Sequence, residues 1–472
     1  MRVVLLDSAP YLIAGSRAEA GLSLLSLAPG ALAVVADQLG PSWNRGTYGL
    51  SDLCAITVDG QAFILPAGTM DDAPALLPVS AAGFGSAISY MGQGLPPQLQ
   101  SLSAIETTTG TFVYYTQWGT AGLGAMALDG DLGLNVVAHV DDDADRGLDA
   151  ITALASAAIG TRDFVFALSG SENTVTSLRI GAEGDLRIVD SITPDEGLWV
   201  SAPSVMEQVV AGGNTYLIVG AVESASLSVI EVVPWGGMTV TDHLVDTLDT
   251  RFDNISALAT LKVNHRILVF AGGSDDGISA MELAPSGRLY PLATVADTNQ
   301  STFQNVTSIT ATEIDGEIQV FAAGEDEAGI TQFTLDLDNF GVLRRGSTDA
   351  EWLNGIWADD LLDGFEGDDV LRGNVGNDRL IDGEGRDILF GGRGDDIFVF
   401  IQDGDLDIAR DFKPGEDQID LSDLDMLYSF DQLTIEQRSY GVVVEYGGEA
   451  LRVESEFGVL EVTDLSPDDF IF

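Results

Sequence analysis

The sequence predicts an all-β protein in which a seven-bladed β-propeller is followed by a parallel β-roll and a further β-rich region. Two internal repeats carry this prediction, one of about fifty residues over 1–345 and one of nine residues over 355–399. Four short strands in each long repeat are typical of a propeller blade, and nine-residue repeats are typical of a parallel coil. We therefore expect a propeller over 1–345, a parallel β-roll over 346–400 and a C-terminal region over 401–472.

The long repeat has a first marker, a small residue in an apolar strand with an apolar residue five positions before it. The small residues are Ala55, Ala104, Ala153, Ser204, Ala257 and Ser308, and the preceding apolar residues are Leu50, Leu99, Leu148, Trp199, Phe252 and Phe303. The small residues follow one another at intervals of 49 to 53 residues. A constant interval of this length indicates one supersecondary unit per repeat.

A second marker is the hydrophobic strand that follows, such as Phe63-Ile64-Leu65 or Tyr216-Leu217-Ile218. The stretch 11–15 matches this marker as well, which makes seven units. Within unit 252–301, turn-forming residues separate four strand-like runs. The expected blades are 1–45, 46–98, 99–147, 148–199, 200–253, 254–301 and 302–345, the first shortened at its start and the second without a clear fourth strand near 81–91. No Trp-Asp or kelch pattern is present, so a β-sandwich array or a β-helix is the competing fold.

The nine-residue repeat places three residue types at fixed positions. The sixth residue is aspartate in all five units, namely Asp360, Asp369, Asp378, Asp387 and Asp396. The eighth residue is always apolar, and glycine holds the fourth position in every unit except the first, which has Ala358. Each unit is therefore expected to form a short strand with an inward apolar side chain, followed by a tight glycine loop. Two units complete one coil, so aspartates eighteen residues apart stack on the same edge.

These stacked loops offer ligands for a hard cation. One carboxylate from each loop together with backbone carbonyls makes an all-oxygen shell that suits calcium. The expected ligating residues are Asp360, Asp369, Asp378, Asp387, Asp396, Gly364, Gly367, Gly373, Gly376, Gly385, Gly391 and Gly394. Asp405, eighteen residues after Asp387, is either a further ligand or a plain loop aspartate. The units resemble the nonapeptide β-roll of the repeats-in-toxin (RTX) family, and this resemblance implies several bound Ca²⁺ ions.

The repeat departs from the RTX pattern at some glycine positions. The replacements are Ala358 in the first unit, Asp382 at a first-glycine position, and Ile356, Phe365 and Asn374 at second-glycine positions. The pairs Asp369/Asp387 and Asp378/Asp396 are therefore better candidates than the pair Asp360/Asp378. The triplet 393–395 spells Arg-Gly-Asp, an adhesion sequence, but it lies inside the repeat, where each residue already has a structural reason.

The C-terminal region resembles the segment that follows the calcium roll in serralysin-type proteases and other type I secreted proteins. The resemblance rests on the runs 407–412, 414–415 and 418–422, and on an acidic pair, Asp468-Asp469, before the hydrophobic end 470–472. It implies the type I secretion machinery as a partner and an extracellular location, either free or at the cell surface. The first residues are a poor secretory signal, because Asp7 and Pro10 soon interrupt them.

The chain is strongly acidic, with a formal net charge of −53 from 74 acidic and 21 basic residues. Charge of this sign and size suits a calcium-rich exterior and argues against nucleic acid or an anionic membrane as a partner. Residues 73–105 carry no charge, but prolines and glycines interrupt them, so membrane insertion is not expected. The single cysteine, Cys54, excludes an internal disulfide and is expected to be buried as a small apolar side chain.

No local catalytic motif is present: neither His-Glu-x-x-His nor a nucleophile elbow, a phosphate-binding loop or a dinucleotide fingerprint. We expect structural roles for the histidines, with His139 and His243 in fourth strands and His265 in a turn. Acidic residues between blades could line a channel site or simply cap turns. They are Asp141, Asp142, Asp143, Asp195, Glu196, Asp246, Asp249, Asp253 and Asp297.

The sequence is therefore compatible with two functions. The first is a non-enzymatic secreted calcium-binding protein, whose propeller is a scaffold for an unidentified extracellular or cell-surface ligand and whose repeats fold on calcium after export. The alternative is an extracellular hydrolase with its active site in the propeller channel. The scarcity of histidine and the dispersed acidic residues favour the first function. Self-assembly of several copies is compatible with either.

Overall fold

The computed structural model describes residues 1–41, 45–143, 146–248, 250–298, 300–335 and 339–472. These residues form strands and four single-turn 3-10 helices, so the all-β prediction is confirmed. The 3-10 helices are η1 (Pro194–Glu196), η2 (Phe430–Gln432), η3 (Val462–Asp464) and η4 (Pro467–Asp469). Within those ranges no helix has the length and apolar character needed to cross a membrane. The chain divides into two compact units, each of which is described by itself.

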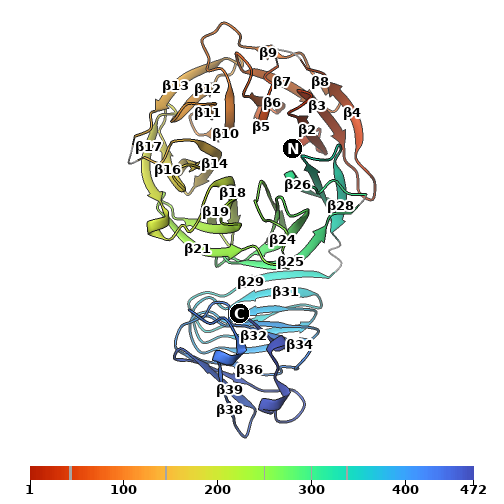
Figure 1. Cartoon of the computed structure of the whole chain (residues 1–472), viewed down its shortest axis with the longest axis vertical. Coiled ribbons are helices and arrows are strands. Elements are labelled where there is room, and N and C mark those ends of the chain that lie inside the picture. Colours follow the sequence, from red (N-terminus) through yellow and green to blue (C-terminus); the bar gives the residue numbers. More distant parts are fainter. Residues whose placement is uncertain (42–44, 144–145, 249, 299, 336–338) are drawn as a thin grey trace. The chain divides into compact units, whose positions relative to one another are not determined.

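The first unit is a seven-bladed propeller whose blades follow one another around a central channel (Figure 1). Blade one contains β1 (Arg2–Leu6), β2 (Ala9–Ser16), β3 (Gly21–Ser26) and β4 (Val34–Leu39). Blade two contains β5 (Leu50–Val58), β6 (Gln61–Gly68), β7 (Ala75–Ser80), β8 (Gly83–Phe84) and β9 (Ile88–Ser89). Blade three contains β10 (Leu99–Thr107), β11 (Gly110–Gln117), β12 (Leu123–Leu128) and β13 (Leu134–Val140).

The remaining blades repeat the same antiparallel order. Blade four contains β14 (Ile151–Ile159), β15 (Arg162–Ser169), β16 (Thr174–Ile180) and β17 (Leu186–Ile192). Blade five contains β18 (Pro203–Ala211), β19 (Asn214–Ala221), β20 (Ser226–Val232) and β21 (Met238–Val245). Blade six contains β22 (Ala257–Val263), β23 (Arg266–Gly272), β24 (Gly277–Leu283) and β25 (Leu289–Ala296). Blade seven contains β26 (Val306–Ile314), β27 (Glu317–Gly324) and β28 (Thr331–Leu335).

The two sequence markers occupy equivalent places in the blades. The small residues lie in the first strand, and the hydrophobic runs form the second strand, which is buried between neighbouring blades. The first strand of the first blade is short, as expected: β1 has 5 residues, whereas the first strands of the other blades have 7 to 9, and it pairs antiparallel with β2. The weak fourth strand of the second blade is confirmed, since two short strands, β8 and β9, both pair with β7.

Hydroxyl groups link successive blades near the channel. In five blades a serine or threonine in the first strand, or directly before it, donates to a backbone carbonyl of the next blade, at 2.5 to 3.1 Å. The donors are Ser51, Ser101, Thr152, Ser204 and Ser256. These residues recur at the blade interval, so one neutral hydrogen bond is repeated around much of the ring.

The ring closes between the seventh and first blades through side chains. Gln332 accepts from the backbone N–H of Ala33 at 2.6 Å and donates to the carbonyl oxygen of Ala31 at 2.9 Å. Leu12 and Phe321 pack in one buried cluster beneath these contacts. Closure therefore depends on glutamine bonds and apolar packing.

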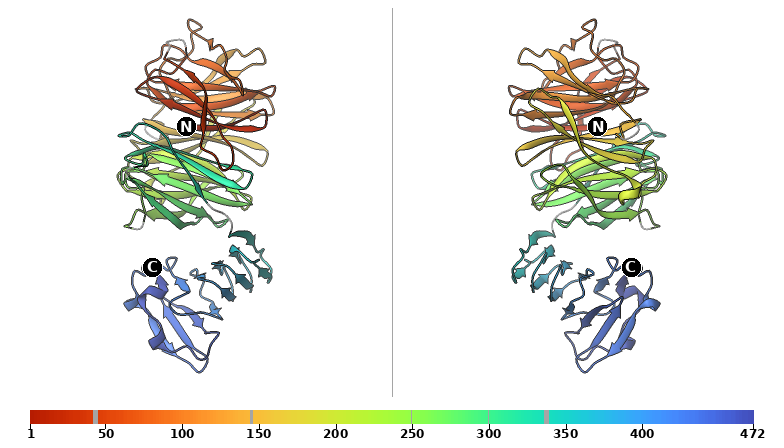
Figure 2. Two further views of the ribbon diagram at one scale, coloured as in Figure 1. Left: turned by 90° about the vertical axis from the view of Figure 1, so that its right-hand side faces the viewer. Right: turned by 90° about the vertical axis from the view of Figure 1, so that its left-hand side faces the viewer.

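The second unit consists of two mainly parallel sheets wound as a coil (Figure 2). One sheet has the order β29 (Phe340–Arg345), β31 (Asp359–Asp363), β33 (Arg379–Ile381), β35 (Ile397–Val399), β37 (Gln418–Asp420) and β41 (Phe470–Ile471). The other has the order β30 (Trp352–Asn354), β32 (Val370–Val375), β34 (Ile388–Arg393), β36 (Leu406–Ala409), β40 (Glu449–Val453), β39 (Val442–Tyr446) and β38 (Thr434–Gln437). The chain alternates between the two sheets, as the nine-residue period predicts.

The eighth-position side chains fill the space between the two sheets. Leu362, Leu371, Leu380, Leu389 and Phe398 are all fully buried in one cluster. Leu362 pairs with Leu380, and Leu380 with Phe398, in parallel register at intervals of eighteen residues. Because of this register, each sixth-position aspartate lies on the same edge of the roll as the aspartate eighteen residues away.

The roll extends beyond the boundaries expected from the sequence. Strand β29, which was expected to complete the seventh blade, instead pairs parallel with β31. At the other end, β36 pairs with β34 and β37 pairs with β35, so the sheets continue past residue 400. The fold therefore does not change at residue 346 or at residue 400.

Candidate metal centre

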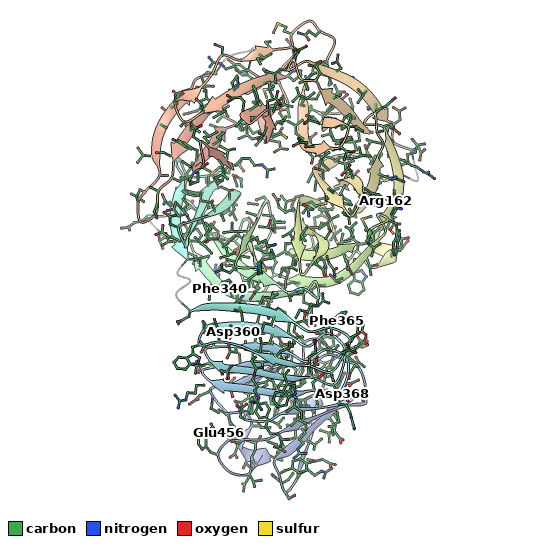
Figure 3. The ribbon with its side chains drawn as sticks, turned by 180° about the vertical axis from the view of Figure 1, so that it is seen from behind. Arg162, Phe340, Asp360, Phe365, Asp368 and Glu456 are labelled. Carbon is green, nitrogen blue, oxygen red and sulfur yellow. The ribbon has the colours of Figure 1, made fainter. Side chains whose placement is uncertain are left out.

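The sixth-position aspartates form two ladders, one on each edge of the roll. Figure 3 shows Asp360 on one edge, and Phe365 and Asp368 of the following loop on the other. In the Asp378 ladder, Asp378 Oδ1 accepts from the N–H of Asp360 at 2.8 Å, and Asp396 Oδ1 accepts from the N–H of Asp378 at 3.0 Å. In the Asp387 ladder, Asp387 Oδ1 accepts from the N–H of Asp369 at 2.6 Å. One oxygen of each carboxylate thus fixes the spacing between coils.

The second oxygen, Oδ2, has no hydrogen-bond partner in four of these aspartates and is buried in each. The four are Asp369, Asp378, Asp387 and Asp396. A buried carboxylate oxygen without a donor is costly, and native proteins satisfy such an atom with a donor or a cation. Asp360 differs, because Val342 N–H donates to its Oδ1 at 2.6 Å and Ile356 N–H to its Oδ2 at 2.5 Å. Both oxygens of Asp360 therefore already have donors.

The unpartnered oxygens lie close to carbonyl oxygens of the next coil. A Cβ placed on Gly373 would lie 2.2 Å from Asp378 Oδ2 and 2.6 Å from the carbonyl oxygen of Gly391. A Cβ placed on Gly364 would lie 3.0 Å from Asp369 Oδ2 and 1.9 Å from the carbonyl oxygen of Asp382. Only glycine fits at the first position of these two loops, and carboxylate and carbonyl oxygens converge beside it. An all-oxygen donor set of this kind fits calcium.

The electrostatics of the ladders also favour a cation. Burial, together with the charges of neighbouring aspartates, raises the pKa of Asp378 and Asp387 to about 8. Burial likewise raises the pKa of Asp396 and Asp407 to about 7. Without a cation, these carboxyls hold protons near neutral pH, whereas a bound divalent ion would stabilise the ionised form.

Residues 359–398 match the family model of the RTX calcium-binding nonapeptide repeat, in four copies. Residues 359–398 are RTX repeats. The matched residues run from the first unit read from the sequence to the fifth and include all five sixth-position aspartates. The resemblance inferred from the sequence is therefore confirmed for this segment.

The other comparisons concern the propeller. No curated protein sequence matches the chain significantly. The periplasmic gluconolactonase of Pseudomonas aeruginosa is 15% identical, with a TM-score of 0.48, and the match covers 69% of this chain and 95% of that one. A functionally unknown protein from Desulfotomaculum acetoxidans is 11% identical, with a TM-score of 0.48, and the match covers 68% of this chain and 94% of that one. A protein from Lactobacillus plantarum is 12% identical, with a TM-score of 0.44, over 66% of this chain and 90% of that one.

Both ladders continue past the RTX repeats, at positions the sequence analysis missed. Asp387 N–H donates to Asp407 Oδ1 at 2.9 Å, and Asp396 N–H donates to Asp417 Oδ1 at 3.1 Å. Asp405, the residue proposed from its spacing, lies outside the ladder and faces Arg386 at 3.8 Å. The loop before Asp407 is two residues longer than a repeat loop, which displaces the ladder position from 405 to 407.

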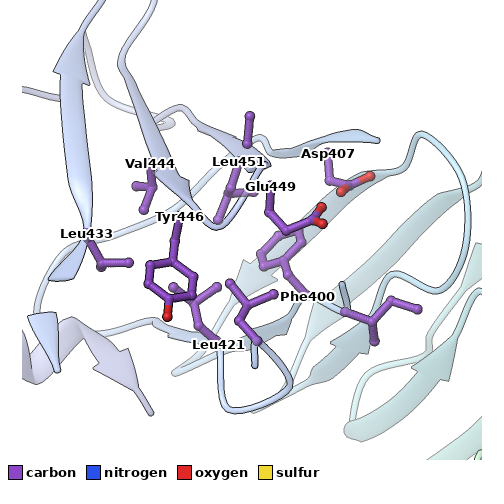
Figure 4. Close-up of a pocket in the computed structure, with 11 residues that line it drawn as sticks. Phe400, Asp407, Leu421, Leu433, Val444, Tyr446, Glu449 and Leu451 are labelled. Carbon is purple, nitrogen blue, oxygen red and sulfur yellow. The ribbon is translucent and has the colours of Figure 1, made fainter. Parts of the chain in front are cut away.

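Two hollows adjoin the last coil. A cavity of about 20 Å³, with room for about one water, is lined mainly by apolar side chains, with Asp407 and Glu449 on one side (Figure 4). An open hollow of about 540 Å³ is lined by Thr348, Glu366, Gly367, Glu384, Gly385, Ile401, Gln402, Asp403 and Asp405. Both RTX loops on the Asp387 edge therefore border an acidic opening through which cations can approach. Among the described residues no group of three or more His, Cys, Asp or Glu side chains could hold a metal by itself, so carbonyl oxygens must complete any site.

The propeller channel contains a charged contact that crosses it. Arg2 of β1 lies 3.9 Å from Asp52 of β5 and 3.9 Å from Glu207 of β18. Blade five is not adjacent to blades one and two, so Arg2 bridges opposite sides of the ring. Nearby Cys54 is buried, as expected, and burial raises its pKa to about 12, which keeps the thiol protonated.

The acidic residues between blades serve mainly as turn caps. Asp142 accepts from the N–H of Leu148 at 2.9 Å, Asp246 from Phe252 at 3.0 Å and Asp297 from Phe303 at 3.2 Å. Each of these carboxylates thus fixes the apolar residue that lies before the first strand of the next blade. This contact supports a structural role for the three aspartates. Asp249 lies outside the described residues.

The histidines have the structural positions expected for them. His139 lies in β13 and His243 in β21, while His265 lies in the turn between β22 and β23. His243 Nδ1 shares a hydrogen bond of 2.9 Å with Ser228 Oγ. Ser228 is fully buried, so this serine–histidine pair has no access to substrate.

Proposed function

We propose that this is a secreted calcium-binding protein whose RTX region stays loose before export and folds on calcium outside the cell. The observation that carries the proposal is the set of four buried Oδ2 atoms without a partner, at Asp369, Asp378, Asp387 and Asp396. In a calcium-poor cytosol, these carboxyls oppose folding, because the folded chain must either bury their charges or take up protons. Outside, an ion held between two coils neutralises them, and its binding free energy contributes to folding.

Export by the type I route is supported by the last residues, whose sequence resembles a C-terminal export signal. In the folded roll, Phe470 and Ile471 form strand β41 and pair with β37. Asp469 accepts from the N–H of Gly415 at 2.7 Å, and Phe470 packs against Phe430 with ring centroids 5.2 Å apart. The proposed signal is therefore part of the folded sheet, so it would be free for the export machinery only while the roll is loose. Calcium-driven folding outside would then make export one-way.

The propeller is proposed as a binding platform for an extracellular or cell-surface ligand. Met70, Trp118, Trp199 and Leu248 are exposed, and all four lie in loops that follow a second strand or precede a first strand. Such loops share one face of a propeller, because the first two strands of a blade run antiparallel. Exposed apolar side chains gathered on one face favour binding of a partner. The alternative of a hydrolase is less well supported, since the acidic residues that meet in the channel are paired with Arg2.

Hydrogen–deuterium exchange of the full chain with calcium and with chelator tests the calcium-driven folding. With calcium, backbone amides of 346–472 should be protected, and chelator should remove that protection while residues 1–335 keep theirs. The propeller acts as the internal control, because neutral hydrogen bonds and apolar packing hold it together. Equal protection of the roll in both conditions would contradict the proposal.

A further inference from the structure

Blade seven lacks the fourth strand that completes the other blades. Among the described residues its sheet has three strands, β26, β27 and β28, whereas every other blade has four or five. The third strand of each of those blades has neighbours on both sides, but β28 pairs with β27 alone. The outer edge of β28 therefore presents backbone N–H and C=O groups that can pair with one more strand.

The residues after β28 have the spacing of a fourth strand. In blades three to six, five residues separate the third strand from the fourth. The fourth of these five residues has a φ between +63° and +93°, at Leu132, Gly184, Gly236 and Gly287. Counted in the same way from Leu335, the corresponding residue is Asn339, and asparagine adopts this conformation more readily than most residues. The same count places Thr334 of β28 opposite Val342 of β29 in an antiparallel hairpin.

In the structure, β29 is held in the roll by residues of the first two RTX units. It pairs in parallel with β31, with one irregularity in the register. Val342 N–H donates to Asp360 Oδ1 at 2.6 Å. The Arg345 guanidinium lies 3.5 Å from Asp363 and also stacks over the ring of Phe365. Because these partners belong to β31 or to the loop after it, they are in place only when the roll is folded.

Blade six does not offer the contact that fixes the fourth strands of two other blades. In blades five and six, the first residue of the fourth strand donates its N–H to an aspartate of the preceding blade. Met238 donates to Asp190 at 2.8 Å, and Leu289 donates to Asp242 at 2.7 Å. The corresponding residue of blade six is Ala293. A fourth strand added to β28 lacks this charge-assisted bond, so it can leave more easily.

We propose that β29 has two alternative partners: without calcium it pairs with β28 as the fourth strand of blade seven, and folding of the roll on calcium transfers it to β31. This inference rests on the proposed calcium-driven folding of the RTX region. While the roll is loose, β29 and the edge of β28 are both unpaired, and only the four residues 336–339 separate them. A hairpin between strands so close in sequence costs little loop entropy. The edge of β28 is then free only where calcium is present.

Disulfide trapping in the full chain tests the hairpin directly. The pair Thr334→Cys and Val342→Cys places two thiols opposite each other in the proposed hairpin. The pair Thr334→Cys and Leu343→Cys is the matched control, because its second thiol points to the other face of the strand. Thr334 is exposed, and the native Cys54 is buried. We expect the first pair to oxidise several-fold faster in chelator than in calcium, and several-fold faster in chelator than the control pair. Equal rates for the two pairs in chelator would overturn the proposal.

Hydrogen–deuterium exchange of the unmodified protein gives a second measurement, read separately for β28, β29 and β31. In chelator, β31 should lose its protection while β29 keeps it, and β28 should gain protection because its outer N–H groups then have partners. Loss of protection in β29 together with β31, or no gain in β28, would overturn the proposal. Protection of β31 that is the same in chelator and in calcium would instead overturn the proposed function, and this inference with it.

Discussion

Asp387 uses its two carboxylate oxygens differently. Oδ1 accepts the N–H of Asp369 at 2.6 Å, while Oδ2 is buried without a partner. Asparagine keeps the first acceptor but replaces the second oxygen with a donor that repels a cation. Asp387→Asn should therefore leave the chelated protein as stable as before or more stable, and should remove calcium-dependent stabilisation of the second unit. At calcium a hundredfold above its dissociation constant, the loss is about 2.7 kcal/mol for each site. Scanning calorimetry with calcium and with chelator measures it.

Asp368→Asn is the matched control for this change. Asp368 Oδ1 also accepts a backbone N–H across eighteen residues, from Arg386 at 3.1 Å, but its side chain is exposed. The control variant should keep the full calcium response, because its carboxylate makes the same ladder bond without facing buried carbonyl oxygens. A full calcium response in Asp387→Asn, or an equal loss in both variants, would show that the ladder carboxylates do not bind calcium.

Glycines decide whether one element of the roll can stack on the next. Gly394 has a φ of +133°, and a Cβ there would lie 1.9 Å from the carbonyl oxygen of Gly376 one coil away. Gly394→Ala should therefore destabilise the second unit by about 3 kcal/mol, combining backbone strain with a clash that the coil cannot relax. Gly404→Ala is the comparison, since Gly404 also has positive φ, +89°, but nothing lies within 4 Å of its Cβ position. Its cost should be about 1 kcal/mol. Equal unfolding midpoints in urea for the two variants would show that close stacking of the coils at Gly394 does not determine the stability of the second unit.

The elements that the sequence predicted best are those whose partners are set by a fixed period. The eighth-position leucines and sixth-position aspartates were placed correctly because every RTX unit has nine residues, so register follows from counting. Asp407 and Asp417 were missed because their loops are longer, and intervals of 20 and 21 residues replace the eighteen of the repeat. Strand β29 was assigned to the wrong sheet because its local pattern suits either one, and its parallel pairing with β31 depends on contacts that no local pattern reveals.

The two units of the molecule differ in what holds them together. Repeated hydroxyl-to-carbonyl bonds and apolar clusters between blades hold the propeller together, and these contacts carry no charge. The RTX region has an apolar core, but its edges carry stacked carboxyls whose charge must be removed by a proton or balanced by a cation. Protons and calcium therefore compete for the same oxygens in the second unit.

This competition fixes the sign of the pH dependence. Burial raises the pKa of Asp378 and Asp387 to about 8, whereas an aspartate in an unfolded chain has a pKa of about 3.9. In chelator, the folded state holds protons that the unfolded state has released. Stability of the second unit is then fully present below about pH 4 and is lost as the pH rises toward 8. In saturating calcium the ligands are ionised, so binding releases protons and the apparent affinity for calcium rises across the same range.

Thermal unfolding of the full chain from pH 5 to pH 8 measures both effects. The transition of the second unit should move to lower temperature with rising pH in chelator, and should hold steady or move to higher temperature in calcium. The propeller transition should change with pH in the same way in both series, because burial raises the pKa of its Asp71 and Asp275 to about 6 whether or not calcium is present. Calorimetric titration at pH 7 in buffers of different ionisation enthalpy should show proton release on calcium binding. A second unit whose stability in chelator rises with pH would mean that these aspartates are ionised without a cation, and that calcium does not replace protons in the ladders.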